Sequence, residues 1–407
     1  MLKLIIVGMI ALIILQIPNA VSAQKIDENF AELDSLIETA LQNNPRISGA
    51  EYNYRAAGYK EKYAGTLPDP MLSIAASNLP KSSLALDETP MSGIAIGITQ
   101  QIPWFSKLRN RSSIANLNTD RTELRKETVI NETVKEVKKA YYNYSYWKKT
   151  TEVLDRYVNL TEALVEVAQT QYANGEGLAQ DVLNAQTSLV KLRDRKRNAA
   201  KMIETALADL RRLTDNRNLS ANLTGHLPGV GNIELSHDSI AAIAQKENPL
   251  IQSAERNIEI SEKRKSLAKA EYLPDMFIGF EYRIREKVAM DAVAGEDFVS
   301  AKIGFSIPLW FAFKQNRKVD EAVEMRFASE RERYSVELLI VNKIENTLLD
   351  IRRKAESIQL YQESIIPLAE AALESSEIAY QVGKTDFLNL ITAQTRLLEF
   401  NIELTKL

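Results

Sequence analysis

The chain has 407 residues, a formal net charge of -3 and no cysteine. The near-neutral charge provides no basic surface for nucleic acid, and the lack of cysteine excludes disulfides, thiolate metal sites and a cysteine nucleophile. After residue 24, no apolar run approaches the roughly 20 residues of a membrane-spanning helix, so any membrane insertion must use strands.

The N-terminus carries a targeting signal. Lys3 precedes an apolar run over 4–15, a helix-breaking Pro18 and small residues that end at Ala23. This pattern predicts a secretory signal peptide over 1–23, with an uncleaved membrane anchor as the alternative. The mature protein is therefore expected to leave the cytoplasm.

The rest of the chain predicts two structural repeats joined by a linker over 214–231. Each repeat contains short helices, a β-hairpin, a long helix that lacks glycine, and a return helix. In the first repeat, 24–213, the hairpin covers 71–102 and the long helix 107–172. In the second, 232–407, the hairpin covers 275–308 and the long helix 314–380. An offset of roughly 205 residues relates the two and indicates a tandem duplication.

The second long helix has a seven-residue apolar repeat that predicts a coiled-coil seam. One row of the seam contains Ile344, Ile351, Ile358 and Ile365. At about 1.5 Å per residue this helix would be roughly 100 Å long. It must therefore pack lengthwise against other long helices.

The hairpins alternate between an apolar face and a small or charged face, as strands of a transmembrane barrel do. On the second face the charges are expected to line a wet lumen: Glu281, Arg283, Arg285 and Lys302. Aromatic residues just beyond the strand ends are expected at the membrane interface, with a helix-start core role as the alternative. These aromatics are Trp104, Phe105, Trp310 and Phe311.

Four strands cannot close a barrel with a lumen, because unpaired edges would remain in lipid. The chain must therefore oligomerise to insert. Three chains would supply about 12 strands, an ordinary size for this class of barrel. The expected fold is mainly α with transmembrane β: a trimeric duct with a shared barrel and long helices that form a tunnel.

Several motifs in this order resemble the outer-membrane efflux protein family, the TolC-type exit ducts of Gram-negative bacteria. They are the Leu67-Pro68-Asp69-Pro70 turn, the strand exit from Gln101 to Lys107, and the turns at 172–175 and 380–383. The resemblance implies a homotrimer in the outer membrane with a long periplasmic extension. It also implies a periplasmic adaptor and an inner-membrane pump as partners.

The same resemblance places a gate at the periplasmic tip. The implied gate and tip residues are Asp181, Tyr380, Lys384, Asp386 and Asn389, and the implied adaptor-contact turns contain Gly175, Glu176, Gly177 and Gly383. Acidic constriction residues of the family are replaced here by Asn389 and Thr392. Two alternatives stay open: Asp181 as a charge favoured by the helix dipole, and Tyr380 as coiled-coil core.

No enzyme motif is present in the sequence, and His226 and His237 are expected at the surface. We expect no catalytic residues, cofactor or metal site. The predicted function is passive export of metal cations or drugs. The main alternative is a periplasmic coiled-coil adaptor or scaffold without a barrel, and a secreted coiled coil is a weaker one.

Overall fold

A computed structural model describes residues 31–229, 236–288 and 295–407 of the chain. The predicted signal peptide lies outside the described residues, as do the last two residues of the predicted linker. The described chain is mainly helical with one four-stranded sheet, which confirms the predicted fold class at the level of the single chain. Among these residues no helix has both the length and the apolar character needed to cross a membrane.

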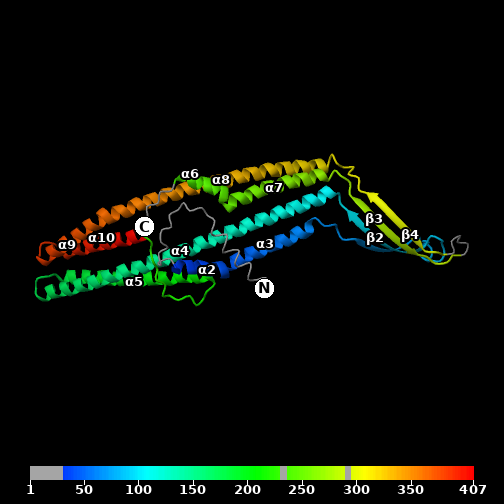
Figure 1. Cartoon of the computed structure of the whole chain (residues 1–407). Helices are drawn as coiled ribbons and strands as arrows, with labels where there is room; N and C mark the ends of the chain where they lie inside the picture. The colour runs from blue at the N-terminus through cyan, green and yellow to red at the C-terminus, as the bar shows by residue number, and fades with distance from the viewer. Residues whose placement is uncertain (1–30, 230–235, 289–294) are drawn as a thin grey trace, which may run out of the picture. The chain divides into compact units, whose positions relative to one another are not determined.

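The same series of elements occurs twice along the chain (Figure 1). The first series is α2 (Ala31–Asn43), α3 (Pro45–Ala64), β1 (Met71–Ser77), β2 (Gly93–Ile102), α4 (Phe105–Ala173) and α5 (Ala179–Thr214). The second is α6 (His237–Glu247), α7 (Pro249–Ala270), β3 (Met276–Ile284), β4 (Phe298–Phe305), α8 (Gln315–Leu360), η2 (Tyr361–Ile365), α9 (Ile366–Gln381) and α10 (Phe387–Lys406).

The short helices begin in the same way in both series. The Asn44 side chain accepts a hydrogen bond from the Arg46 amide, and Asn248 accepts one from the Leu250 amide, each at 2.9 Å. In each case proline follows at the first helical position, where its missing N–H costs nothing. The Asn-Pro pairs thus cap the next helix as well as ending the previous one.

The second long helix, predicted over 314–380, is helical without a gap from Gln315 to Gln381, but one turn inside it is not α-helical. A π-helical turn, η2, separates α8 from α9, and the Ile366 amide bonds to the Tyr361 carbonyl across it. Pro367 follows directly. Proline has no N–H to donate and its ring crowds the carbonyl four residues earlier, so the widened turn relieves a conflict that an α-helix would hold.

The described chain forms two compact units. One contains residues 31–42, 136–229 and 375–406, and the other contains 43–135, 236–374 except 289–294, and Leu407. The first unit has a tyrosine-rich core in which α2 packs on α4 and α5. Its largest fully buried side chains include Tyr141, Tyr144, Leu207 and Leu210.

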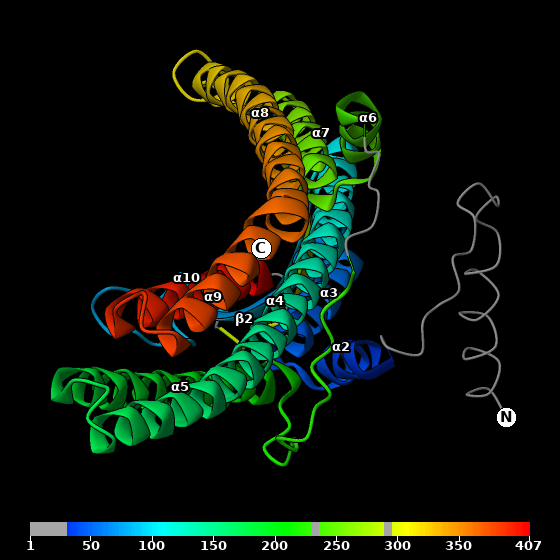
Figure 2. The ribbon, with the colours of Figure 1, turned by 90° about the vertical axis from the view of Figure 1, so that its left-hand side faces the viewer.

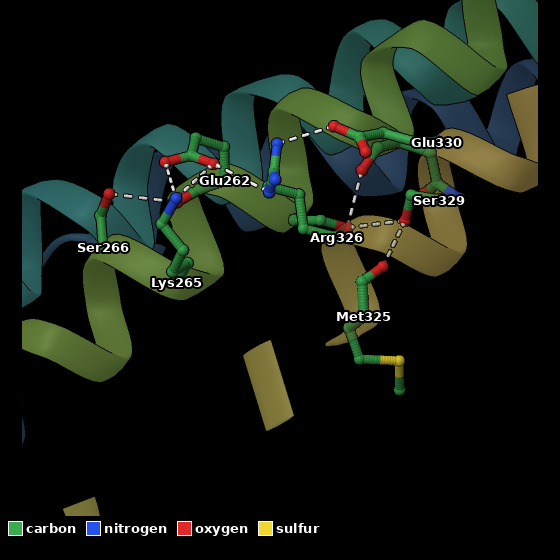
Figure 3. Close-up of polar contacts among 9 residues, drawn as sticks. Glu262, Lys265, Ser266, Met325, Arg326, Ser329 and Glu330 are labelled. Carbon is green, nitrogen blue, oxygen red and sulfur yellow. Dashed lines mark hydrogen bonds and ion pairs between the residues drawn. The ribbon is translucent and has the colours of Figure 1, made fainter. Parts of the chain in front are cut away.

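In the second unit α7 lies along the first half of α8 (Figure 2). The buried Ser261 and Ser329 hydroxyls lie 2.9 Å apart across this contact. Beside them, the Glu262 carboxylate binds Lys265 on its own helix and Arg326 of α8, and Arg326 also binds Glu330 (Figure 3). Small side chains at the contact let the helices approach, and ion pairs border it.

The sheet has the order β1-β2-β3-β4, and every neighbouring pair is antiparallel. In Figure 1, β2, β3 and β4 run side by side. Ile96 lies opposite Ile74 in β1 and opposite Tyr282 in β3, and Tyr282 lies opposite Val299 in β4. Since residues directly opposite share a face, the apolar rows of all four strands align on one side of the sheet.

Candidate functional site

The first predicted adaptor-contact turn ends α4 in a Schellman motif. Gly175 has a φ of 78°, and its amide bonds to the Tyr172 carbonyl at 3.1 Å. The amides of Glu176 and Gly177 both bond to the Gln171 carbonyl, at 2.9 and 3.1 Å. These bonds satisfy carbonyls that the end of the helix leaves without partners.

The second turn repeats this backbone after Tyr380. Gly383 has a φ of 69° and bonds to the Tyr380 carbonyl at 3.0 Å, and the Lys384 amide bonds to the Ala379 carbonyl at 2.8 Å. A Cβ added at either Gly175 or Gly383 would meet nothing within 4 Å. The left-handed backbone, and not crowding, therefore requires glycine at both turns.

Tyr380 is the penultimate residue of α9, directly before the second turn, and its side chain is buried. Its ring packs edge-on against Phe387 with centroids 5.3 Å apart. Among the described residues its hydroxyl has no hydrogen-bond partner. Burial and the nearby Asp181 carboxylate raise the pKa of Tyr380. A buried hydroxyl without a hydrogen-bond partner raises the free energy of the folded state. A rearrangement that gave the Tyr380 hydroxyl a partner would therefore be favoured.

Asp181 is half-buried and lies in the first turn of α5, where the helix dipole favours a negative charge. The other predicted tip residues, Lys384, Asp386 and Asn389, are exposed, and the Asn389 amide donates to the Thr385 hydroxyl at 3.1 Å. The Asp181 charge thus acts on the buried Tyr380 hydroxyl, whereas the other three residues face solvent.

Sequence reasoning missed the polar contact that joins the second return helix to α4. The Gln394 side chain, which is 3% exposed, donates to the Thr161 hydroxyl at 2.9 Å, and Asn401 donates to the Tyr157 hydroxyl at 3.3 Å. Gln394 belongs to an Ala-Gln pair that occurs in both repeats, and the equivalent glutamine of the first repeat, Gln186, is exposed. The pair is visible in the sequence, but which glutamine is buried is not.

The sheet places three of the four predicted lumen charges on one face. Glu281 binds Arg283 and Lys302, both at 2.9 Å. Arg285 follows β3; it is 7% exposed and its guanidinium lies 4.1 Å from the centre of the Phe298 ring. Both signs of charge therefore lie side by side on this face.

The opposite face is apolar and uncovered. Ile74 is 71% exposed, Val299 74% and Ile303 70%. The predicted interface aromatics, which follow β2 and β4, are also largely exposed. They are Trp104 at 46%, Phe105 at 75%, Trp310 at 72% and Phe311 at 52%. A continuous apolar sheet face of this kind requires a nonaqueous partner.

Where β2 leaves the sheet, a buried ion pair that the sequence did not reveal joins the two repeats. Lys107 binds the Asp275 carboxylate at 2.7 Å and the Leu273 carbonyl at 2.8 Å, and the Trp104 amide donates to the same carboxylate at 3.0 Å. The Lys107 side chain is 7% exposed. Breaking such a pair would leave a buried charge alone, so it fixes how the first long helix leaves the sheet.

A third missed contact, at Glu32, lies in the first unit. The Glu32 carboxylate accepts hydrogen bonds from the Tyr141 hydroxyl at 3.0 Å, from the Thr224 amide and hydroxyl at 2.8 and 2.9 Å, and from the Gly225 amide at 3.3 Å. Burial acts to raise the Glu32 pKa, but these bonds outweigh it and lower the pKa. They hold the segment after α5 against α2 and α4.

Among the described residues, no group of three or more His, Cys, Asp and Glu side chains could hold a metal ion. His226 is bound through its amide to the Tyr141 hydroxyl at 3.2 Å, and His237 lies beside Asp238 on an exposed helix start.

The arrangement defines a class of protein. The model of the outer membrane efflux protein family matches residues 36–216 and 241–407, and the chain belongs to this family. This finding confirms the predicted family and the predicted location in the outer membrane. It also favours an efflux channel over the adaptor or scaffold alternative.

One sequence relative and two solved structures agree with this family assignment. The outer membrane protein TolC of Vibrio cholerae serotype O1 is 21% identical over 405 residues, which cover 93% of this chain and 86% of the relative. The outer-membrane channel OprN matches with a TM-score of 0.78 and 16% identity over 92% of this chain and 86% of that chain. The Campylobacter jejuni CmeC outer membrane channel matches with a TM-score of 0.76 and 14% identity over 92% and 82%. These similarities show the shared fold.

Proposed function

We propose that the protein is the exit duct of a tripartite efflux system, a homotrimer that passively conducts small substrates across the outer membrane. An inner-membrane pump and a periplasmic adaptor supply the substrates, which are metal cations or drugs. The observation that carries the proposal is the aligned, uncovered apolar face of the sheet, which has charged residues on its other side.

In the trimer the apolar face meets lipid and the face that contains Glu281, Arg283 and Lys302 lines the lumen. A lone sheet cannot enter lipid, because β1 and β4 each have one edge without a partner in the described chain. Three copies close the edges into a barrel of about 12 strands. Trp104, Phe105, Trp310 and Phe311 then anchor the interface between lipid and water.

The helices support the same arrangement. In α8, η2 and the start of α9, no residue from Val341 to Ala372 is buried, although the seam residues Ile344, Ile351 and Ile358 lie in this stretch. A bare coiled-coil seam requires partner helices. In the proposed duct, neighbouring copies cover it and the helices together enclose a tunnel.

The two reversal turns form the periplasmic tip in this proposal. Gly175, Glu176, Gly177 and Gly383 present exposed backbone to the adaptor, and Lys384, Asp386 and Asn389 lie beside them on the solvent side. Tyr380 and Asp181 hold the tip closed, and docking of the adaptor changes their contacts. Support comes from the buried Tyr380 hydroxyl. It has no hydrogen-bond partner in the described chain, and the Asp181 charge contributes to its raised pKa.

The mixed charges of the lumen face support a passive role. Glu281 is compensated by Arg283 and Lys302, so the lining does not present a single sign of charge. A lining of this kind repels neither cations nor anions strongly, and selectivity then belongs to the pump. Metal cations and drugs are proposed because the Pro-Asp-Pro turn and the Pro-Trp-Phe strand exit resemble family members that serve such pumps.

An export assay tests this function. A deletion strain is challenged with metal salts and, separately, with lipophilic drugs, with and without the wild-type chain. We expect the deletion to raise sensitivity to at least one of the two classes and the wild-type chain to restore resistance. Unchanged sensitivity to both classes, together with impaired secretion of a protein, would contradict the proposed cargo.

Channel recordings test the gate. Asp181→Ala and Tyr380→Phe are expected to raise single-channel conductance, because each removes one of the two groups proposed to hold the tip closed. Tyr172→Phe is the matched control, since Tyr172 occupies the equivalent position of the first turn but is 54% exposed. Wild-type conductance in both gate variants would overturn the assignment.

A further inference from the structure

A cavity lies in the second unit at the point where the chain passes from β4 into α8. Its volume is about 300 Å³, and it is lined by the starts of α4 and α8, the segment after α7 and the strand exit from Ser306 to Trp310. Two hydrogen bonds fix part of this lining. The Asp275 amide donates to the Ser306 hydroxyl at 2.9 Å, and the Ser306 amide donates to the Asp275 carbonyl at 2.8 Å. The cavity is large enough for a small polar group.

One buried polar atom in the lining lacks a partner. Gln315, the first residue of α8, is 7% exposed, and its carboxamide oxygen has no hydrogen-bond partner among the described residues. A buried oxygen of this kind raises the free energy of the folded chain unless a donor reaches it. Since Gln315 lines the cavity, a ligand that enters the cavity can supply the missing donor.

The cavity also contains two cationic side chains that no acid neutralises. Arg111, in the second turn of α4, and Lys314, directly before α8, both line it and are exposed. Neither has an ion-pair partner in the part of the chain that the structure describes. The acids of the lining are already engaged, because Asp275 belongs to the buried ion pair described above and Glu271 binds Lys318 at 2.5 Å. The uncompensated charge is therefore positive and favours an anion.

The strand exit that lines the cavity is apolar and uncovered. Ile307 is 71% exposed and Leu309 is 72% exposed, and Trp310 follows them. In the proposed duct Trp310 lies at the interface between lipid and water, on the side where the helices begin. This places the cavity at the depth of the lipid headgroups on the periplasmic side. An occupant should therefore join an anionic group to an apolar chain.

We propose that the cavity binds the headgroup of a glycerophospholipid from the leaflet that faces the periplasm. Arg111 and Lys314 bind the phosphodiester, and an ammonium or hydroxyl group of the headgroup donates to the Gln315 oxygen. The acyl chains lie against Leu309 and Trp310. The inference rests on the proposed function, because only a chain inserted in a membrane meets such lipids.

Lipid titration of the detergent-solubilised trimer tests the site. Native mass spectrometry measures the dissociation constants of phosphatidylethanolamine, phosphatidylglycerol and phosphatidylcholine with the same acyl chains. All three contain the phosphodiester, but the trimethylammonium group of phosphatidylcholine has no N–H to donate. We expect the first two to bind about tenfold more tightly than phosphatidylcholine. Soluble glycerophosphoethanolamine should bind at least about tenfold more weakly than phosphatidylethanolamine, because it has no acyl chains to bury.

Three side-chain variants and a control sharpen the test. Gln315→Leu removes the oxygen at nearly constant volume, so it should abolish the preference over phosphatidylcholine without destabilising the lipid-free trimer. Arg111→Ala and Lys314→Ala should each weaken the binding of all three lipids about tenfold. Arg109→Ala is the matched control, since Arg109 is exposed on the same helix but does not line the cavity. Its lipid affinities should equal those of the wild type.

The outcomes separate this inference from the proposed function. Equal binding of the three lipids by a conducting trimer, or an unchanged lipid preference in Gln315→Leu, would overturn the site and leave the duct intact. Equal binding of glycerophosphoethanolamine would overturn the lipid as ligand in favour of a free phosphate ester. Loss of the trimer in Arg111→Ala with unchanged lipid affinity would assign the cavity to contact between copies instead. Failure of the unmodified chain to insert or conduct would overturn the proposed function itself.

Discussion

Two helical stretches of similar length differ in how much of their surface one chain can cover. In α4, residues 137–168 contribute fully buried side chains such as Val137, Tyr141 and Ala168. Between Val341 and Ala372, no side chain of the second long helix is buried, although its apolar repeat is just as regular.

A regular apolar seam therefore predicts that a helix packs against partner helices, but it does not predict whether those helices belong to the same chain or to another copy. α4 finds them in α2 and α5 of its own chain. The later part of α8 and the apolar face of the sheet lack them in the described chain. Regions whose apolar surface is covered within one chain should keep their stability when the protein is diluted. Regions whose apolar surface is uncovered should depend on assembly with other copies.

The largest effect is expected from a charge on the apolar face of the sheet. Ile303→Arg should cost about 2–4 kcal/mol of membrane insertion, because an arginine would face the hydrocarbon. Ser300→Arg is the matched control on the lumen face of the same strand and should insert normally. Insertion is measured as the fraction of protein recovered as heat-resistant trimer from membranes. Equal recovery of the two variants would refute the assignment of the faces.

A charge in the bare seam should come next. Ile351→Asp should cost about 3 kcal/mol of assembly, because an unpaired carboxylate would be buried between copies. Its neighbour Arg352 provides the control, since Arg352→Asp changes charge outside the predicted seam. Analytical ultracentrifugation in detergent measures the shift from trimer toward monomer. A shift of the same size in both variants would show that the seam is not the contact.

Glu32→Gln tests a region that one chain completes. Loss of the charged acceptor should destabilise the protein by about 2 kcal/mol at neutral pH. The hydrogen bonds lower the Glu32 pKa, so their contribution is present above the unfolded value of about 4.3 and is lost as the pH falls through the folded value. Chemical denaturation should therefore show the gap between wild type and variant closing as the solution is acidified. A gap that is constant with pH would contradict this account.

The smallest effect is expected at the turns. Gly383→Ala should cost about 1–2 kcal/mol, because alanine resists the positive φ although space is available. Gly175→Ala should cost the same, since the two turns share their backbone. Thermal unfolding measures both variants. A large difference between them would show that something other than backbone strain requires one of the glycines.

Much of the fold follows from patterns that depend on neighbours along the chain. The period-two alternation around Ile96 and Tyr282 predicts the strands, and the positive φ at Gly175 and Gly383 belongs to turns that the sequence places between helices. Both signals depend only on neighbouring residues. The duplication strengthened these predictions, because each motif could be compared with the equivalent motif of the other repeat.

The contacts that were missed join residues far apart in the sequence. Lys107 and Asp275 lie in different repeats, and Gln394 meets Thr161 although its counterpart Gln186 stays exposed. Periodicity cannot distinguish these partners from other polar residues at similar spacing. The π-helical turn before Pro367 was also missed, because a proline can be relieved by a kink, a break or a widened turn.

The most direct test of the central claim is to add the purified, detergent-solubilised mature protein to a planar lipid bilayer and record the current. The account predicts discrete, long-lived conductance steps from wild-type protein, and larger steps from Tyr380→Phe. Protein that stays soluble without detergent and gives no steps, even with the gate variant, would contradict the claim that three copies close a membrane duct.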